Sequence, residues 1–278
     1  MKVAVAQTAP VLGDVNANLE KIRLFQHQAK ADGAELVVFP ELALSGYAVA
    51  QEVYRYALKE SDDAFRTLLE LSRDLPMIVG FIERSARGRV YNAAALIDGG
   101  KIVHLHRKVY LPSYGAWEEG KIFARGKHLG VFRYRGFRMA IFICYDFWFP
   151  SMVYLAACDD ADVFVVIANS SLDSGGMNPR AWDHLIRGPA LLYGGYVVFC
   201  NRVGVEHGWS FWGGSTVIGP AGASDVAAGT GEEIIYKTLE PEAVERARDA
   251  LPLLRDLDVD FTLRELQEVT RRRISEND

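Results

Sequence analysis

The sequence predicts an α/β fold with mixed β-sheets, and three features of the chain lead to that prediction. Short apolar runs bounded by turn residues alternate with segments of helical periodicity along most of the 278 residues. Hairpin signals interrupt this alternation, so strands of both directions are expected to share a sheet. Roughly 12 strand-like segments occur in a chain without a Pro/Ser linker, which favours two sheets within one domain.

The first half of the chain starts with a strand and then alternates helices with strands. The first helix has apolar residues near every 3.6 positions, and Asp14 or Asn16 caps it. A second helix begins at residues 61–63, where two acidic residues favour an N-terminus. Strands are expected at residues 3–7, 36–39, 77–82, 90–97 and 101–106, with a hairpin turn at 98–100.

The second half repeats this organisation and ends in a charged tail. Strands are expected at residues 129–134, 137–143, 163–168, 196–201, 214–218 and 232–237. Helices are expected at residues 150–158, 182–193 and 240–250. We therefore predict one domain over residues 1–255. The tail, residues 256–278, is either a surface helix or an arm that reaches a partner.

Composition excludes several classes of protein. The chain has 31 Lys and Arg against 36 Asp and Glu, a net charge of −5, which argues against a nucleic-acid-binding protein. Three cysteines are too few for a disulfide scaffold, so we expect reduced thiols and a cytoplasmic location. The apolar run at the start is too short for a signal peptide, and no apolar stretch is long enough for a membrane span.

Reactive side chains follow apolar strands at three places, and a fourth place is a loop rich in aromatic residues. Glu41, Lys108 and Cys144 each come directly after a predicted strand, where α/β folds build their sites. The loop at residues 114–126 carries two adjacent carboxylates, one of them Glu119. Taken alone, each residue has a plain structural interpretation: a solvated loop charge, or an inert buried thiol. A cysteine becomes a nucleophile only where a cation, a base or a helix N-terminus favours its thiolate.

Taken together, the segments around these residues resemble the nitrilase superfamily, the carbon–nitrogen hydrolases. The resemblance runs from residue 1 to about residue 240 and is specific because all the pieces occur in order. The matching segments are Phe39-Pro40-Glu41-Leu42 with Ser45-Gly46-Tyr47, His106-Arg107-Lys108 with Leu111-Pro112, the loop of Glu119, Phe123 and Gly126, Ile143-Cys144-Tyr145-Asp146 with Phe149-Pro150, Asn201-Arg202-Val203-Gly204, and Gly214-Ser215 before Pro220-Ala221-Gly222. The amidase-like branch is the nearest match.

This resemblance implies a fold, a catalytic set and an assembly. The fold would be a four-layer α-β-β-α sandwich with two mixed β-sheets. The catalytic residues would be Glu41, Lys108 and Cys144, with Glu119 as the second glutamate that many members place beside the lysine. No metal or cofactor is implied. Members commonly form homodimers or higher homo-oligomers, and the tail at residues 256–278 would contribute to that interface.

The chemistry implied is attack of the Cys144 thiolate on a small amide, with Glu41 as general base and acid. Lys108 would stabilise the oxyanion, and Glu119 would hold Lys108 in position. The pocket residues expected from neighbouring loops are Tyr114, Trp117, Tyr145, Trp148 and Asn169. For each aromatic ring, plain packing is the alternative interpretation.

The function predicted is hydrolysis of a small linear amide to a carboxylic acid and ammonia through a cysteine thioester. An N-carbamoyl amidohydrolase and a nitrilase are the alternatives within the superfamily. The Cys-Tyr-Asp context at residues 144–146 argues against the nitrilase. A non-catalytic binding or scaffold relative is an alternative of another class. Ser151 and the segment 189–193 depart from the family pattern, so a substrate cannot be carried over from a well-known branch.

Overall fold

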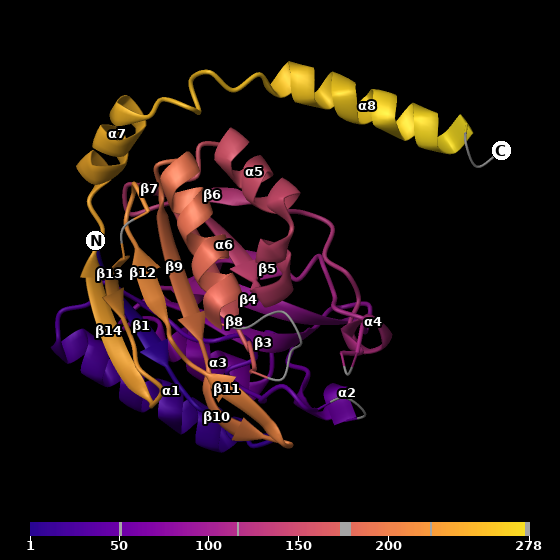
Figure 1. Ribbon diagram of the computed structural model, residues 1–278. Helices are drawn as coiled ribbons and strands as arrows, with labels where there is room; N and C mark the ends of the chain where they lie inside the picture. The colour runs from indigo at the N-terminus through magenta and orange to yellow at the C-terminus, as the bar shows by residue number, and fades with distance from the viewer. Residues whose placement is uncertain (50–51, 116, 173–178, 223, 276–278) are drawn as a thin grey trace.

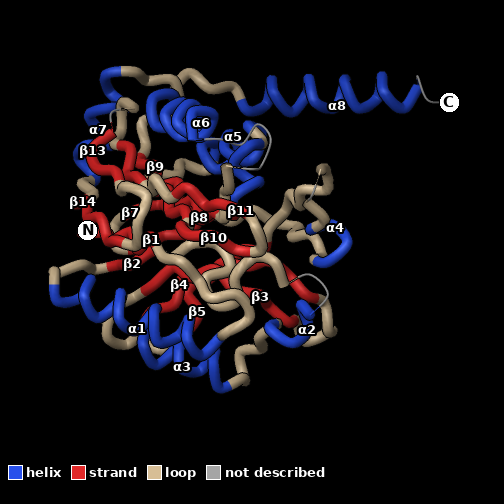
Figure 2. The backbone as a smooth tube through the Cα atoms, turned by 60° about the horizontal axis from the view of Figure 1, so that its bottom comes forward, coloured by secondary structure: helices blue, strands red, loops and turns tan. Residues whose placement is uncertain are grey.

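Four layers of secondary structure build the protein, which a computed structural model describes except for residues 50–51, 116, 173–178, 223 and 276–278. Two β-sheets stack face to face, and helices cover the outer face of each sheet (Figure 2). The predicted α/β sandwich with two mixed sheets is therefore confirmed.

The first sheet has the strand order β14-β1-β2-β3-β4-β5. Its strands are β1 (Lys2–Gln7), β2 (Leu36–Val38), β3 (Met77–Arg84), β4 (Val90–Asp98), β5 (Lys101–Arg107) and β14 (Glu233–Thr238). The central strands β1, β2 and β3 are parallel, while β14, β4 and β5 join by antiparallel pairing. Because two reversals separate β3 from β5, the edge strand β5 runs in the same direction as β2.

The second sheet has the strand order β13-β12-β9-β8-β7-β6. Its strands are β6 (Val131–Tyr134), β7 (Phe137–Ile143), β8 (Val163–Ala168), β9 (Tyr196–Asn201), β12 (Thr216–Ile218) and β13 (Ser224–Ala227). Strands β7, β8 and β9 are parallel, and the others pair antiparallel. Both sheets thus have a parallel centre, whose strands are buried on both faces and read as continuous apolar runs.

Helices α1 (Val15–Ala31) and α3 (Asp63–Leu71) cover the first sheet, and α5 (Pro150–Cys158) and α6 (Pro179–Leu192) cover the second. The Asp14 side chain caps α1 by accepting the backbone N–H of Ala17 at 2.9 Å, which decides between the two caps that the sequence allowed. Leu19 and Ile22 pack beneath the first sheet. The largest apolar cluster lies between the two sheets and continues beneath α5 and α6.

The structure also contains elements that the sequence did not predict. A hairpin of β10 (Val203–Glu206) and β11 (Trp209–Trp212) follows β9. Two short helices, α2 (Val53–Tyr56) and α4 (Glu119–Ile122), interrupt loops, and a 3₁₀ helix spans Cys144–Trp148. These segments are too short for a helical or strand period to be visible in the sequence.

The tail is helical and leaves the body of the molecule. After α7 (Pro241–Ala250), helix α8 (Val259–Ser275) passes over the end of α5 and extends beyond the body of the molecule (Figure 1). Tyr154 and Thr262 link it to α5 through a hydrogen bond of 2.8 Å between their hydroxyl oxygens. Within the described part of the chain, no helix is both long and apolar enough to cross a membrane.

Candidate active site

The carboxyl ends of β2, β5, β7 and β8 bring the polar candidates to one edge of the sandwich. Glu41 follows β2, Lys108 follows β5, Cys144 follows β7 and Asn169 follows β8. All four side chains are buried. Parallel strands collect the residues that follow them at a common edge, so residues far apart in sequence meet there.

Glu41 is held by three hydrogen-bond donors. Its Oε1 accepts Asn92 Nδ2 at 2.7 Å and Lys108 Nζ at 2.8 Å, and its Oε2 accepts the backbone N–H of Asn169 at 2.8 Å. Glycine is required beneath this turn: a Cβ on Gly80 of β3 would lie 2.5 Å from the carbonyl oxygen of Pro40. Three donors around two oxygens suit a carboxylate rather than a carboxylic acid.

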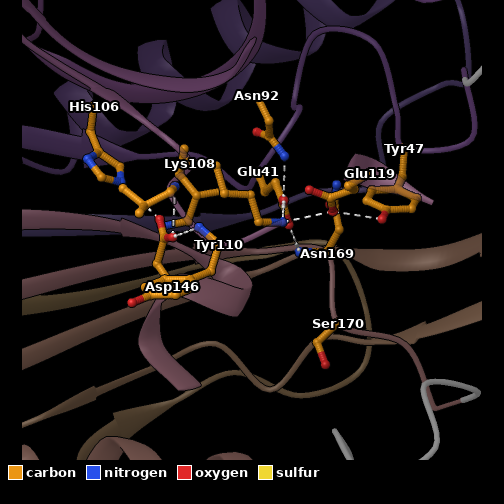
Figure 3. A network of polar contacts seen from close by, with 12 residues as sticks. Glu41, Tyr47, Asn92, His106, Lys108, Tyr110, Glu119, Asp146, Asn169 and Ser170 are labelled. Atoms are coloured by element: carbon orange, nitrogen blue, oxygen red, sulfur yellow. Dashed lines mark hydrogen bonds and ion pairs between the residues drawn. The ribbon is translucent and has the colours of Figure 1, made fainter. Parts of the chain in front are cut away.

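Lys108 lies between two carboxylates, as Figure 3 shows. Its Nζ donates to Oε1 of Glu41 and to Oε1 of Glu119, both at 2.8 Å. Burial alone lowers the pKa of Lys108, but the negative charges of Glu119 and Glu41 outweigh it and raise that pKa. The lysine is therefore a cation at neutral pH despite being almost completely buried.

Glu119 reaches the site from the first turn of the short helix α4. Its Oε1 accepts a second hydrogen bond, from the hydroxyl of Tyr47 at 2.7 Å. Its Oε2 is buried without a hydrogen-bond partner among the described residues. Burial raises the pKa of Glu119 to about 7; Lys108 lowers it and Glu41 raises it further. One oxygen of this carboxylate is thus fixed, and the other is left for a ligand.

Cys144 stands at a sharp turn where β7 passes into the 3₁₀ helix. Its backbone has φ of 45°, in the left-handed region, which costs an ordinary residue about 1–2 kcal/mol. Burial raises the pKa of the Cys144 thiol well above its usual value, and the charge of Glu41 raises it further. The Lys108 cation and the backbone N–H of Asn169 lower it. The resting thiol therefore keeps its proton, and an attack on an electrophile needs a base beside it.

Asp146 ties the cysteine turn to the lysine segment. Its Oδ1 accepts the backbone N–H groups of Val109 and Tyr110 at 3.0 and 2.9 Å, directly after Lys108. Its Oδ2 contacts Nε2 of His106 at 2.9 Å and accepts the N–H of Ile143 at 3.2 Å. This one carboxylate therefore joins both segments on which the reactive side chains lie.

A narrow cavity joins these groups. It is lined by Glu41, Tyr47, Pro112, Trp117, Glu119, Cys144, Tyr145, Asn169 and Ser170. Three of the five pocket residues expected from the sequence, Trp117, Tyr145 and Asn169, are among the lining residues. The other two do not line it: the Tyr114 ring packs 5.7 Å from that of Tyr145, and Trp148 packs edge-on against Trp182, which is the packing alternative for these rings.

Sequence reasoning did not assign a role to Tyr47 or Asn92. Tyr47 was part of a matching segment, but the sequence contains no sign that its hydroxyl meets a residue 72 positions away. Asn92 could have been noticed as a lone amide in the apolar run that forms β4. The β10–β11 hairpin also contributes, because the Trp209 ring packs on those of Tyr47 and Trp117 at 5.6 and 4.6 Å.

Buried Glu206 of β10 holds the loop that carries Tyr47. Its Oε1 accepts the backbone N–H groups of Tyr47 and Ala48, both at 2.8 Å, and its Oε2 pairs with Arg202 at 2.6 Å. Among the described residues, no group of three or more His, Cys, Asp or Glu side chains is arranged to hold a metal ion. The site is thus an arrangement of one cation, two carboxylates and one thiol.

Comparison with known proteins shows which family the sequence and the fold belong to. A family model described as carbon-nitrogen hydrolase matches residues 2–249. The omega-amidase NIT3 of Saccharomyces cerevisiae is 29% identical over 269 residues, which are 91% of this chain and 91% of that protein. The crystal structure of that NIT3, a member of branch 10 of the nitrilase superfamily, has a TM-score of 0.82 and covers 91% of this chain and 94% of its own.

Two further relatives extend the comparison. The glutamine-dependent NAD(+) synthetase of Thermotoga maritima is 30% identical over 95% of this chain, but this chain spans only 43% of that protein. An amidase variant from Nesterenkonia sp. AN1 is 26% identical, with a TM-score of 0.82 over 95% of this chain and 96% of its own. Its structure shows covalent addition of the acetamide moiety of fluoroacetamide at the active site cysteine.

Proposed function

This chain belongs to the carbon–nitrogen hydrolase family, and we propose that it hydrolyses a small linear amide to a carboxylic acid and ammonia through a thioester on Cys144. The observation that carries the proposal is the position of Lys108, whose Nζ lies 2.8 Å from each of two buried carboxylates beside the thiol. A buried cation so placed can stabilise negative charge that develops on a carbonyl oxygen. The Nesterenkonia amidase, with its acetamide adduct on cysteine, supports the same chemistry.

Glu41 moves the proton in both half-reactions. As Cys144 Sγ attacks the carbonyl carbon, its proton passes to Glu41, and Lys108 Nζ stabilises the oxyanion together with the backbone N–H of Tyr145. Protonated Glu41 then gives this proton to the nitrogen as the C–N bond breaks, so that ammonia leaves and a thioester remains.

Water completes the cycle with the same residues. Glu41 removes a proton from water as its oxygen attacks the thioester carbon. When the C–S bond breaks, that proton returns to Sγ and the carboxylic acid leaves. Each half-reaction restores Glu41 to the carboxylate, so one residue serves as base and acid twice.

The substrate is proposed to be small because the cavity is small and its walls are rigid rings. Tyr47, Trp117 and Tyr145 line the cavity, and the Tyr47 and Trp117 rings are 5.2 Å apart, which leaves little room between them. The free Oε2 of Glu119 can accept an N–H of the substrate amide. We expect turnover to fall as the acyl chain lengthens; a flat profile from formamide to hexanamide contradicts this substrate class.

The test of the reaction is a screen for ammonia release over amides, carbamoyl compounds and nitriles, with glutamine included because two relatives are a glutamine-dependent synthetase and an omega-amidase. Cys144→Ala is expected to abolish release and to keep the fold. Cys158→Ala serves as the matched control, since Cys158 lies in α5, outside the cavity. Undiminished turnover in Cys144→Ala refutes the mechanism. Absence of turnover on the whole panel by the unaltered protein favours a binding or scaffold role.

We also propose that the protein forms a homo-oligomer through α8. This helix projects from the body (Figure 1) and leaves more than half of the surface of Phe261, Leu263, Leu266 and Ile274 exposed. Such apolar surface is commonly covered by a partner, and a second copy is the partner proposed. Light scattering after size exclusion is expected to give a dimer or larger species that Leu263→Asp with Leu266→Asp converts to monomer; a monomeric unaltered protein contradicts it.

A further inference from the structure

A basic hollow lies on the surface, apart from the cavity that holds Cys144. It is bounded by the turn between β3 and β4, by the end of β5 and by the loop after α4. Its basic lining residues are Arg87, Arg89, Arg107, Arg125, Lys127 and His128. No Asp or Glu is among the described residues that line it. This concentration of positive charge is unusual in a chain whose net charge is −5.

Among the residues that the structure describes, a carboxylate neutralises one of these cations. Arg107 makes a two-pronged ion pair with Glu83, with Nε and NH2 each 2.5 Å from a carboxylate oxygen. Arg87, Arg89, Arg125 and Lys127 have no ion pair with a carboxylate among the described residues, although Arg125 Nε donates a hydrogen bond to the carbonyl oxygen of Val109 at 2.9 Å. Four cations around one hollow repel each other, and a concave surface concentrates their field. An anion seated there relieves this repulsion.

Both walls of the hollow are fixed by backbone hydrogen bonds. In the turn between β3 and β4, the N–H of Ser85 donates to the backbone carbonyl oxygen of Arg89 at 2.9 Å. In the opposite wall, the N–H of Gly126 donates to the backbone carbonyl oxygen of Lys108 at 2.7 Å. A Cβ on Gly126 would lie 2.0 Å from the carbonyl oxygen of Arg107, so only glycine permits this approach. The cations therefore start from fixed backbone positions, which lowers the entropy lost when a ligand binds.

We propose that the basic hollow binds a small anion with two or more linked phosphate groups, such as pyrophosphate or the phosphate chain of a nucleotide. Three of the four cations that lack a carboxylate partner are arginines, whose planar fork matches phosphate oxygens in pairs. Four positive charges match the charge of a diphosphate better than that of a single carboxylate. A nucleic acid fits less well, because its long backbone would extend over the acidic remainder of the surface.

The proposal is independent of amide hydrolysis, because the charged residues of the hollow do not line the cavity of Cys144. Titration calorimetry of the full chain with pyrophosphate, at constant ionic strength, is expected to show one saturable site. The same titration with ATP distinguishes the sources: equal affinity indicates recognition of the phosphates alone, and tighter binding indicates a nucleotide. Both results support the proposal.

The variant Arg87→Ser with Arg89→Ser is expected to bind pyrophosphate at least tenfold more weakly. Arg246→Ser with Arg264→Ser is the matched control, since it removes the same charge from α7 and α8 and should leave binding unchanged. Thermal melting checks that both variants fold. The proposal is overturned by no saturable binding, by an equal loss in the two variants, or by a long single-stranded DNA that competes at far lower concentration than pyrophosphate.

Discussion

Replacing Tyr47 by Phe removes one hydroxyl and leaves the ring that packs on Trp117 in place. That hydroxyl donates to Oε1 of Glu119 at 2.7 Å inside the protein. A buried hydrogen bond to a charged group contributes about 1.5–3 kcal/mol, and one pKa unit corresponds to about 1.4 kcal/mol. Because the donor favours the ionised carboxylate, its loss is expected to move the pKa of Glu119 from about 7 upward by about one to two units.

The assay is the pH profile of kcat/KM for amide hydrolysis. At pH 7 Glu119 is about half ionised in the unaltered protein, whereas in Tyr47→Phe about one tenth or less remains ionised. If ionised Glu119 supports Lys108, activity at pH 7 falls about fivefold or more and recovers near pH 9. Tyr236→Phe is the control, because the hydroxyl of Tyr236 donates its hydrogen bond to Asp32 on the exposed surface. A loss of the same size at every pH refutes the reasoning.

Three further substitutions test the framework of the site. Gly80→Ala forces a Cβ into the turn beneath the site, so it is expected to lower the free energy of unfolding by about 1–3 kcal/mol and to lower kcat. Gly231→Ala is the control, because its Cβ meets open space, and thermal melting and rate measurements should show no change in either quantity. Asp146→Asn weakens the contact with a buried imidazole and should lower kcat more than it raises KM, with a stability loss of about 1–3 kcal/mol; an unchanged kcat contradicts a positioning role. The pKa of Glu119 is raised from 4.5 to about 7, so its contribution to stability is present at low pH and lost as the pH rises through 7. Relative to Glu119→Gln, the unaltered protein should therefore lose stability between pH 4.5 and 7. Melting temperatures of the two proteins that change in parallel over this pH range would count against the raised pKa.

Most of the strands could be predicted because each is a local feature. The run at residues 163–168 became β8 (Val163–Ala168) and the run at 196–201 became β9 (Tyr196–Asn201), since central parallel strands are apolar on both faces. Segments whose structure depends on distant partners were missed. The β10–β11 hairpin is anchored by buried Glu206, whose carboxylate accepts backbone hydrogen bonds from a loop about 160 residues earlier in the chain. The hydrophobic periodicity of the sequence contains no signal for such a long-range contact.

The same distinction applies to the site. Positions just after apolar strands made Glu41, Lys108 and Cys144 candidates, and the order of the surrounding motifs, through the family resemblance, assigned their roles. It could not show that Glu41 and Glu119 accept from the same lysine nitrogen at equal distances, or that Tyr47 fixes one oxygen of Glu119. Nor could it show the left-handed turn at Cys144. Strand patterns and motifs follow from short-range chemistry, whereas charge states and hydrogen bonds depend on which buried groups the packed sheets bring within 3 Å of each other.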